Sequence, residues 1–296
     1  MACFGPLTAY YGKDVNPVTG RRPLVFRKDR SHSGIALQVP CGQCIGCKLE
    51  RSRQWAMRCL HEMKMHSESA FVTLTYEDST LPAHGSLHKR HLQLFMKRLR
   101  KQRPTGLRFY GCGEYGGITG RPHYHVLLLN TCFSDMKKRS WGLERQEHET
   151  YASAELRELW PYGENVIGEV NFETCAYVAR YCTKVVTGDR AAAYYGLREP
   201  EFAVMSRRPG LGLEWFRKYH EEAYAHDSGI INSRECPLTR YYDGKFELLD
   251  SSRLEDIKLA RRRRAVANKS DNTSRRRWTK EQLAIRTMEF FVREKS

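Results

Sequence analysis

The sequence contains no apolar run close to the roughly 20 residues that a membrane-spanning helix requires. Its N-terminus, MACFGPLTAY, lacks the basic segment followed by an apolar one that is typical of a secretory signal. Internal repeats and a nucleoside-triphosphate loop of the form G-x4-G-K-[ST] are also missing. These absences favour a soluble cytosolic protein that has no membrane partner and depends on another protein for any helicase activity.

Acidic residues are scarce. The chain of 296 residues has 34 Asp and Glu against 50 Lys and Arg, which gives a formal net charge of +16. The segment 251–296 alone holds 14 basic and six acidic residues. A chain this basic is expected to bind a polyanion, and counterion release makes nucleic acid the leading candidate. An acidic membrane surface is the weaker alternative.

Three segments differ in pattern: a Cys-rich segment with a helix over 1–66, an enzyme-sized domain over 67–220, and a basic region over 221–296. In the middle segment, strands are expected at 70–76, 107–115, 124–130 and 165–172, and helices at 86–101, 152–160 and 174–186. The short link GGITGRP requires that the strands on either side of it be antiparallel. The sequence therefore predicts an α+β fold with a central antiparallel sheet flanked by helices.

The basic C-terminal region is expected to bind DNA or to be partly flexible. Its last helix is predicted to begin at Thr279, because Thr279 and Gln282 have capping-box spacing.

The stretch GRPHYHVLLLN places His123 and His125 at the start of a buried strand. Residues two apart on a strand share one face, so both imidazoles can bind one metal ion. Glu114 comes level with them if the chain reverses between positions 115 and 122. One carboxylate and two imidazoles leave positions open for water or substrate, as is typical of a catalytic ion such as Mg²⁺ or Mn²⁺. The alternative is that all three are ordinary residues of a half-buried hairpin.

Two tyrosines and a lysine share one stripe of the helix expected at 174–186. Tyr177 and Tyr181 are four residues apart, and Lys184 follows Tyr181 by three. A phenol can act as a nucleophile when a nearby ammonium, or a metal ion that withdraws charge from the attacked group, assists it. In a basic protein with a divalent ion, the attacked group that fits is a phosphodiester. An ordinary amphipathic face is the alternative interpretation.

Three stretches resemble, in order and spacing, the motifs of HUH endonucleases that initiate rolling-circle replication: FVTLTY (71–76), RPHYHVLLL (121–129) and YVARYCTK (177–184). Together with CGQCIGCKLERSRQWAMR, GEYG and MSRRPGLG, they are most similar to the replication initiators of microviruses, in particular of the gokushovirus branch. The resemblance covers residues 1–220 and leaves out the C-terminal tail.

The resemblance implies a central antiparallel sheet with the histidine strand in its middle and the tyrosine helix lying across the metal ion. By position it implies metal ligands, nucleophiles and an assisting residue, which are Glu114, His123 and His125, then Tyr177 and Tyr181, then Lys184. The spacing Tyr-x-x-Lys favours Tyr181 for the first attack. Tyr124 departs mildly from the apolar residue that is usual between the two histidines.

The implied activity is that of a DNA nickase and ligase. It acts on the single-stranded origin DNA of a circular replicon through a 5′-phosphotyrosine intermediate. It would work in the cytoplasm of a bacterial host, with the host helicase and polymerase as partners.

The stretch PCGQCIGC places Cys41, Cys44 and Cys47 at C-x2-C-x2-C spacing. An iron–sulfur sequence of this type needs a further cysteine at position 51, which is arginine. Zinc also needs a fourth ligand. Cys3 is favoured over Cys59, because a helix after Cys47 carries Cys59 about 18 Å away at roughly 1.5 Å per residue. We expect structural Zn²⁺, with reduced thiols as the alternative.

Four arginines and a tryptophan are candidates for DNA contacts: Arg121, Arg180, Arg207, Arg208 and Trp278. Arg121 adjoins the histidine strand, the pair at 207–208 adjoins a Gly-rich turn, and Trp278 could stack on a base. Taken singly, each is equally explained as a solvated surface residue. Their sum predicts a steep salt dependence of DNA binding.

Two other functions stay open. A non-enzymatic, zinc-containing nucleic-acid-binding protein would use Glu114, His123 and His125 only structurally. A plasmid initiator or transposase of the same superfamily would share the chemistry but serve another replicon.

Overall fold

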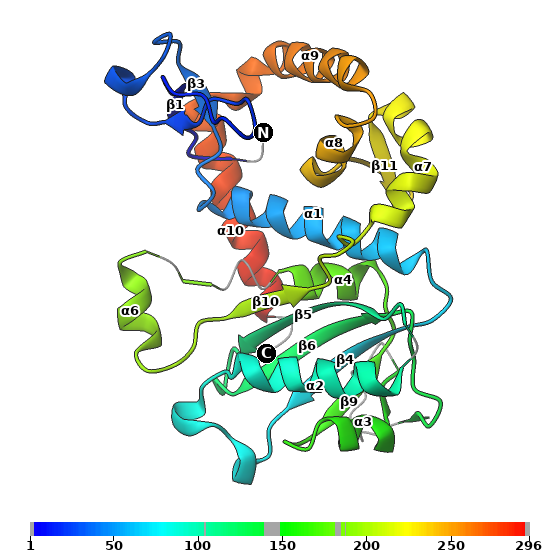
Figure 1. Cartoon of the computed structure of the whole chain (residues 1–296). Coiled ribbons are helices and arrows are strands. Elements are labelled where there is room, and N and C mark those ends of the chain that lie inside the picture. Colours follow the sequence, from blue (N-terminus) through cyan, green and yellow to red (C-terminus); the bar gives the residue numbers. More distant parts are fainter. Residues whose placement is uncertain (1–2, 104, 139–148, 181–184, 187, 294–296) are drawn as a thin grey trace. The chain divides into compact units, whose positions relative to one another are not determined.

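The apolar runs of the middle segment form a seven-stranded antiparallel sheet of order β10-β5-β6-β4-β9-β8-β7 (Figure 1). The structure is a computed structural model and describes residues 3–103, 105–138, 149–180, 185–186 and 188–293. The strands are β4 (Ser69–Thr75), β5 (Arg108–Tyr115), β6 (Pro122–Leu129), β7 (Lys137–Lys138), β8 (Tyr151–Ala152), β9 (Asn165–Gly168) and β10 (Phe202–Met205). The predicted α+β class with a central antiparallel sheet is confirmed.

The two central strands are buried on both faces, which explains their near-continuous apolar sequences. On one face lies α2 (Lys89–Gln102), which runs along the sheet in Figure 1, together with α3 (Ala154–Leu159). The buried residues of α2 are those that its periodicity predicts, namely Leu92, Phe95, Met96 and Leu99. They pack with Val126 and Leu128 of β6 in the larger of the hydrophobic clusters that contain the sheet.

On the other face, residues of α1 (Ile45–Met63) and α4 (Phe172–Ala179) pack on the alternate residues of the same strands. Tyr110, Cys112, Leu127 and Leu129 are buried here. This parity is also that of Glu114, His123 and His125. The face that carries the predicted ligands is therefore the one covered by the tyrosine helix.

The start of α4 has a specific physical cause. The Asn171 side chain accepts a hydrogen bond from the Thr174 N–H at 2.8 Å, and the Thr174 hydroxyl accepts one from the Asn171 N–H at 2.9 Å. This capping box begins the helix at Phe172. The strand expected over 165–172 therefore ends early, at Gly168.

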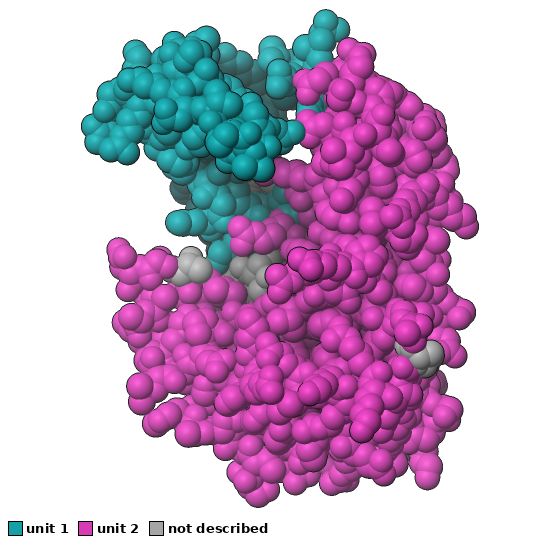
Figure 2. All heavy atoms as spheres, in the orientation of Figure 1, with its two compact units in different colours: residues 1–50, 258–296 teal, residues 51–257 magenta. Residues whose placement is uncertain are grey.

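Residues 51–257 form one compact unit, drawn in magenta in Figure 2. Beyond the sheet it contains α6 (Arg190–Tyr195), α7 (Leu213–His226), α8 (Arg240–Phe246) and a hairpin of β11 (Ser228–Ile231) and β12 (Arg234–Pro237). The short 3₁₀ turns η2 (Asp78–Thr80) and η3 (Ala83–Gly85) precede α2. A separate cluster around Phe216, Tyr224, Tyr242 and Phe246 holds α7 and α8 together.

Residues 1–50 and 258–296 form the other unit. It contains a three-stranded sheet of order β2-β1-β3, made of β1 (Leu7–Tyr11), β2 (Leu24–Val25) and β3 (Leu37–Val39), and the turns η1 (Lys28–Arg30) and η4 (Lys269–Asn272). The boundaries between the units fall within α1 and α9 (Ser251–Ala267).

The last helix, α10 (Ser274–Arg293), begins five residues before the predicted start at Thr279. The prediction was wrong because the Thr279 hydroxyl donates to the Arg275 carbonyl at 3.1 Å, a bond made inside a helix rather than at its cap. Among the described residues, no helix combines the length and apolar character needed to cross a bilayer.

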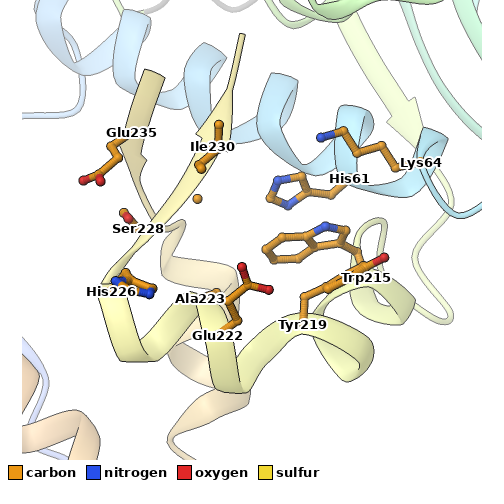
Figure 3. A pocket seen from close by; sticks show the side chains of 11 residues that line it. His61, Lys64, Trp215, Tyr219, Glu222, Ala223, His226, Ser228, Ile230 and Glu235 are labelled. Carbon is orange, nitrogen blue, oxygen red and sulfur yellow. The ribbon is translucent and has the colours of Figure 1, made fainter. Parts of the chain in front are cut away.

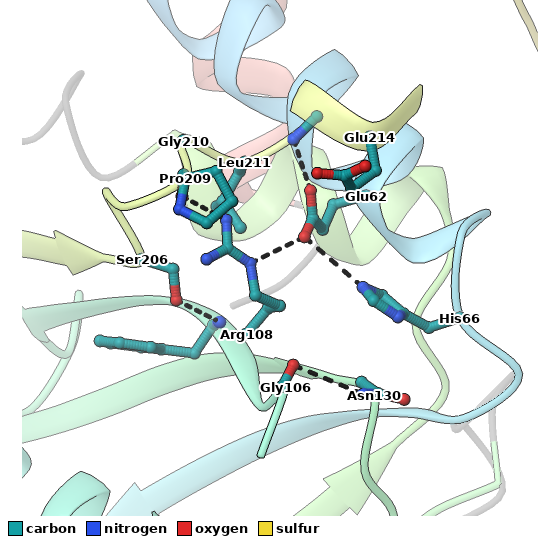
Figure 4. Close-up of polar contacts among 12 residues, drawn as sticks. Glu62, His66, Gly106, Arg108, Asn130, Ser206, Pro209, Gly210, Leu211 and Glu214 are labelled. Carbon is teal, nitrogen blue, oxygen red and sulfur yellow. Dashed lines mark hydrogen bonds and ion pairs between the residues drawn. The ribbon is translucent and has the colours of Figure 1, made fainter. Parts of the chain in front are cut away.

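A buried ion pair fastens the loop between β10 and α7 to the helix α1 (Figure 4). The Glu62 carboxylate accepts hydrogen bonds from Arg108 Nε at 2.8 Å and from the Gly212 N–H at 2.6 Å. Gly212 has φ 81°, a left-handed conformation that glycine adopts without strain. Arg108 in turn donates to the Pro209 carbonyl. The loop that carries Arg207 and Arg208 therefore depends on one carboxylate.

Removing this carboxylate should strongly destabilise the protein. We expect Glu62→Ala to lower the free energy of unfolding in urea by about 3–5 kcal/mol, because it leaves the buried Arg108 charge without its partner. Glu62→Gln keeps an acceptor for the Gly212 N–H and should cost less. Equal, small losses for both variants would contradict this role for the ion pair.

Candidate metal and nucleophile site

Three predicted ligands converge at one end of the β5–β6 hairpin. In the observed register Glu114 lies directly opposite His123, and Cys112 opposite His125. Glu114 Oε1 is 3.1 Å from His123 Nε2 and 3.3 Å from His125 Nε2. Glu114 and His125 are buried, whereas His123 is partly exposed. The three ligand atoms lie within 4.8 Å of one another, so they can share one ion.

The separations fit a single divalent cation. Two donors held about 2.1 Å from one ion lie about 3.0 Å apart at a right angle and about 3.4 Å apart in a tetrahedron. The 3.1 Å and 3.3 Å distances fall in this range. Three protein ligands leave coordination positions for water or substrate oxygens. A mixed nitrogen and oxygen set suits Mn²⁺, and it is compatible with Mg²⁺ and Zn²⁺.

The hydrogen bonds of His123 orient its ring for such a cation. Its Nδ1 lies 3.1 Å from the backbone carbonyl of Arg121, which can only accept, so Nδ1 carries a proton. In the neutral ring Nε2 then presents its lone pair to the Glu114 carboxylate. A lone pair and a carboxylate repel unless a cation lies between them, and that cation is either a proton or a metal ion.

His125 is oriented by two residues of β4. Thr73 lies opposite His125 in the register, and its Oγ1 is 2.9 Å from His125 Nδ1. Phe71 stacks on the imidazole, with ring centroids 5.6 Å apart and an interplanar angle of 14°. Sequence reasoning assigned neither residue a role at the site, although FVTLTY was recognised as a motif. The missing information was the β4–β6 register, which places Phe71 and Thr73 on the histidine face.

Tyr177 brings its phenol to the same three ligands. Its hydroxyl donates to Glu114 Oε1 at 3.2 Å and lies 3.4 Å from His125 Nε2. Its ring meets His125 edge to face, with centroids 4.9 Å apart, and Phe71 likewise at 6.3 Å. Burial raises the pKa of Tyr177, and the neighbouring Glu114 carboxylate raises it further. A cation at the ligands would offset that effect and favour the phenolate.

Two predicted site residues, Tyr181 and Lys184, lie outside the described residues. α4 is described to Ala179, with Arg180 as its C-cap. The Arg180 guanidinium carbon is 5.9 Å from the centre of the Tyr177 ring. Arg180 is therefore the described cation nearest in sequence to this phenol, and its charge lowers the phenol pKa.

The other predicted DNA contacts differ in their surroundings. Arg121 donates to Asp78 Oδ1 at 2.6 Å and to the Tyr76 carbonyl at 2.9 Å, so it braces the turn beside the histidines. Arg207 and Arg208 are exposed in the loop between β10 and α7. Trp278 is 63% exposed on α10, in the other compact unit.

The structure also brings the four predicted cysteines together. The Sγ atoms of Cys3, Cys41, Cys44 and Cys47 lie within 4.8 Å of one another. Cys59, the residue that sequence reasoning set aside, is fully buried in the cluster under α1 and α4.

A pocket elsewhere in residues 51–257 contains none of the predicted site residues (Figure 3). Its volume is about 390 Å³, and its walls come from α1, α7 and the β11–β12 hairpin. His61 and Trp215 stack there with ring centroids 3.6 Å apart. Burial lowers the pKa of His61 to about 3, and its Nδ1 lies 2.9 Å from the Tyr242 hydroxyl. His61 is thus a neutral packing residue.

Comparison with known proteins agrees with this arrangement. A family model of replication-associated proteins, described by the name ORF2, matches residues 69–186, the segment that contains every ligand and Tyr177. The chain is 33% identical over 254 residues to the replication-associated protein VP4 of Bdellovibrio phage phiMH2K, covering 82% of this chain and 76% of that protein. The chain belongs to the family of phage replication-associated proteins.

Two further members are similar to this initiator-type chain. The replication-associated protein ORF2 of Spiroplasma virus 4 is 31% identical over 267 residues, which is 83% of this chain and 81% of that protein. The replication-associated protein ORF4 of Chlamydia phage 1 is 27% identical over 216 residues, 70% of this chain and 53% of that protein. No solved structure is a significant match.

The Thr73 contact is directly testable. We expect Thr73→Val, which removes the hydroxyl and keeps the shape, to weaken Mn²⁺ binding about 10- to 100-fold, because His125 loses the partner that orients its ring. The free-ion electron paramagnetic resonance signal measures this affinity. Thr75→Val is a matched control, since Thr75 Oγ1 bonds the Glu164 carbonyl at 3.3 Å and no histidine. Equal affinities for both variants and the unaltered chain would rule out a positioning role.

Proposed function

We propose that this phage replication-associated protein is a site-specific nickase and ligase of single-stranded origin DNA, which starts and ends rolling-circle replication in the host cytoplasm. The observation that carries the proposal is the meeting of a phenol with a metal-ligand set. The Tyr177 hydroxyl lies 3.2 Å from Glu114 Oε1 and 3.4 Å from His125 Nε2. A nucleophile beside three ligands with open positions is an arrangement suited to phosphodiester cleavage.

The cleavage step can be written in full. The Tyr177 oxygen attacks the phosphorus, the new O–P bond forms, and the bond from phosphorus to the 3′ oxygen breaks. The phenol proton is lost and the 3′ oxygen gains a proton. The products are a 5′-phosphotyrosine and a free 3′-hydroxyl, which a polymerase can extend. The reverse attack by a 3′-hydroxyl restores the phosphodiester and closes a circle.

Each side chain has a distinct task in this proposal. A divalent ion, when bound, would polarise the phosphate and stabilise the leaving oxygen. Glu114, His123 and His125 would hold it, Thr73 and Phe71 would fix the His125 ring, and Tyr177 would supply the nucleophile. Tyr181 and Lys184 are proposed, by resemblance, as the second nucleophile and the assisting cation.

The proposal predicts a covalent adduct with single-stranded DNA. Labelled oligonucleotides that tile both strands of the replicon encoding the chain are incubated with the protein and Mn²⁺, then run on a denaturing gel. One tile is expected to yield a protein-linked product. Tyr177→Phe combined with Tyr181→Phe should abolish it while DNA binding persists, because only the hydroxyls are removed.

Matched variants separate chemistry from folding. Tyr194→Phe changes a half-exposed tyrosine on α6 and should leave the adduct unchanged. His123→Ala should abolish the adduct, because it removes a ligand on which the proposed ion depends. The single Tyr177→Phe and Tyr181→Phe variants assign the first attack. Retained DNA binding without any adduct from the unaltered chain would instead support a non-enzymatic binding protein.

The exposed arginines of the β10–α7 loop should act through phosphate contacts. If Arg207 and Arg208 each neutralise one phosphate of single-stranded DNA, replacing both by Gln lowers the slope of log affinity against log salt by about 1.4. Fluorescence anisotropy across a salt series measures this slope. An unchanged slope would exclude these two residues from the DNA contact.

A further inference from the structure

The second ligand cluster consists only of cysteines and belongs to the unit of residues 1–50 and 258–296. Cys3 Sγ is 3.6 Å from Cys41 Sγ and 3.9 Å from Cys44 Sγ, and Cys41 Sγ is 4.0 Å from Cys47 Sγ. All four cysteines are free rather than disulfide-bonded. A disulfide would bring two sulfurs to about 2.05 Å, so these contacts have another cause.

The separations match the edges of a zinc–thiolate tetrahedron. With Zn–S bonds of about 2.3 Å, tetrahedral geometry places the sulfurs about 3.8 Å apart. The three measured distances, 3.6, 3.9 and 4.0 Å, bracket that value. A tetrahedron of this size holds one ion and has no room for the bridging sulfides of an iron–sulfur cluster.

The backbone around the cysteines is arranged to stabilise thiolates. The N–H groups of Phe4, Cys41 and Cys44 donate to the sulfurs of Cys44, Cys3 and Cys41, at 3.4, 3.2 and 3.3 Å. Such bonds favour the charged form of a sulfur ligand. Four thiolates this close repel one another strongly, so they require a cation among them.

The surrounding unit has little else to hold it together. Among its described side chains, the only buried apolar ones are Cys3 and Ala9. Val18, Phe26 and Ile35 are 92%, 61% and 67% exposed. A segment this small without an apolar core normally needs a metal or disulfides to fold.

The cysteines lie where a metal would clamp the small sheet. Leu7 of β1 pairs with Val39 of β3. Cys3 precedes β1 by a few residues, and Cys41 follows β3 almost at once. An ion bound to both would tie the two strands at the end where their pairing starts.

We propose that Cys3, Cys41, Cys44 and Cys47 bind one structural Zn²⁺, which replaces a hydrophobic core and holds the β1–β3 pair. The closed four-thiolate set leaves no position for substrate, so the ion is not catalytic. Thiolates favour zinc, whereas Glu114 with two histidines accepts Mn²⁺, so the two sites select different metals. This inference does not depend on the proposed nickase activity.

The metal content of the full chain tests the proposal. Elemental mass spectrometry of protein purified without chelators, from medium supplemented with zinc, is expected to find one zinc and no iron per chain. Cys44→Ser should lose that zinc. Cys132→Ser and Cys236→Ser are controls, because these partly buried cysteines lie outside the cluster and should keep it. Iron in place of zinc, or no metal at all, would overturn the assignment.

Two further measurements keep the result interpretable. Glu114→Gln combined with His123→Ala should retain the zinc, and loss of zinc there but not in Cys44→Ser would place the ion at the other site and contradict the proposal. Hydrogen exchange should report the clamp: in Cys44→Ser, the amides of β1 and β3 are expected to exchange about tenfold faster or more, with β5 and β6 unchanged. Unchanged exchange in β1 and β3 would remove the structural role.

Discussion

The antiparallel register that sets Glu114 opposite His123 is the constraint on which the rest of the site depends. Because β5 and β6 are buried on both faces, a slip of one residue would move every apolar side chain to the wrong face. The packing energy of the hairpin therefore also fixes the ligand geometry. A carboxylate and two imidazoles are held together by residues that never touch them.

The site is built from three further contacts on this frame. Thr73 and Phe71 of β4 orient His125, and the carbonyl of Arg121 fixes the proton of His123 on Nδ1. The capping box at Asn171 begins α4 where Tyr177 reaches Glu114. None of these contacts requires a bound ion, so the side chains are preorganised, and the cost of assembling the site is met by folding.

Strand parity and helical periodicity predicted much of this arrangement. The parity of β5 and β6 was sufficient to group Glu114 with His123 and His125 on one face, because a six-residue turn allows little freedom of register. Cys3 was selected by excluding Cys59, and it lies beside Cys41. The buried face of α2 followed from its spacing alone.

Other features depend on tertiary contacts that no local pattern contains. The strands β1, β2 and β10 are short, and β10 is stabilised by pairing with the edge of β5 rather than by its own residues. The Asp78–Arg121 ion pair joins residues 43 positions apart. The expected start of the last helix failed because capping-box spacing also occurs inside helices, as at Thr279.

The central claim is that Glu114, His123 and His125 hold a divalent cation beside the Tyr177 hydroxyl. Anomalous diffraction at the manganese edge, from crystals grown with Mn²⁺, tests it most directly. The account predicts one peak at bonding distance from Glu114 and from Nε2 of both histidines. The absence of a peak there, with the imidazoles instead hydrogen-bonded directly to the carboxylate, would contradict it.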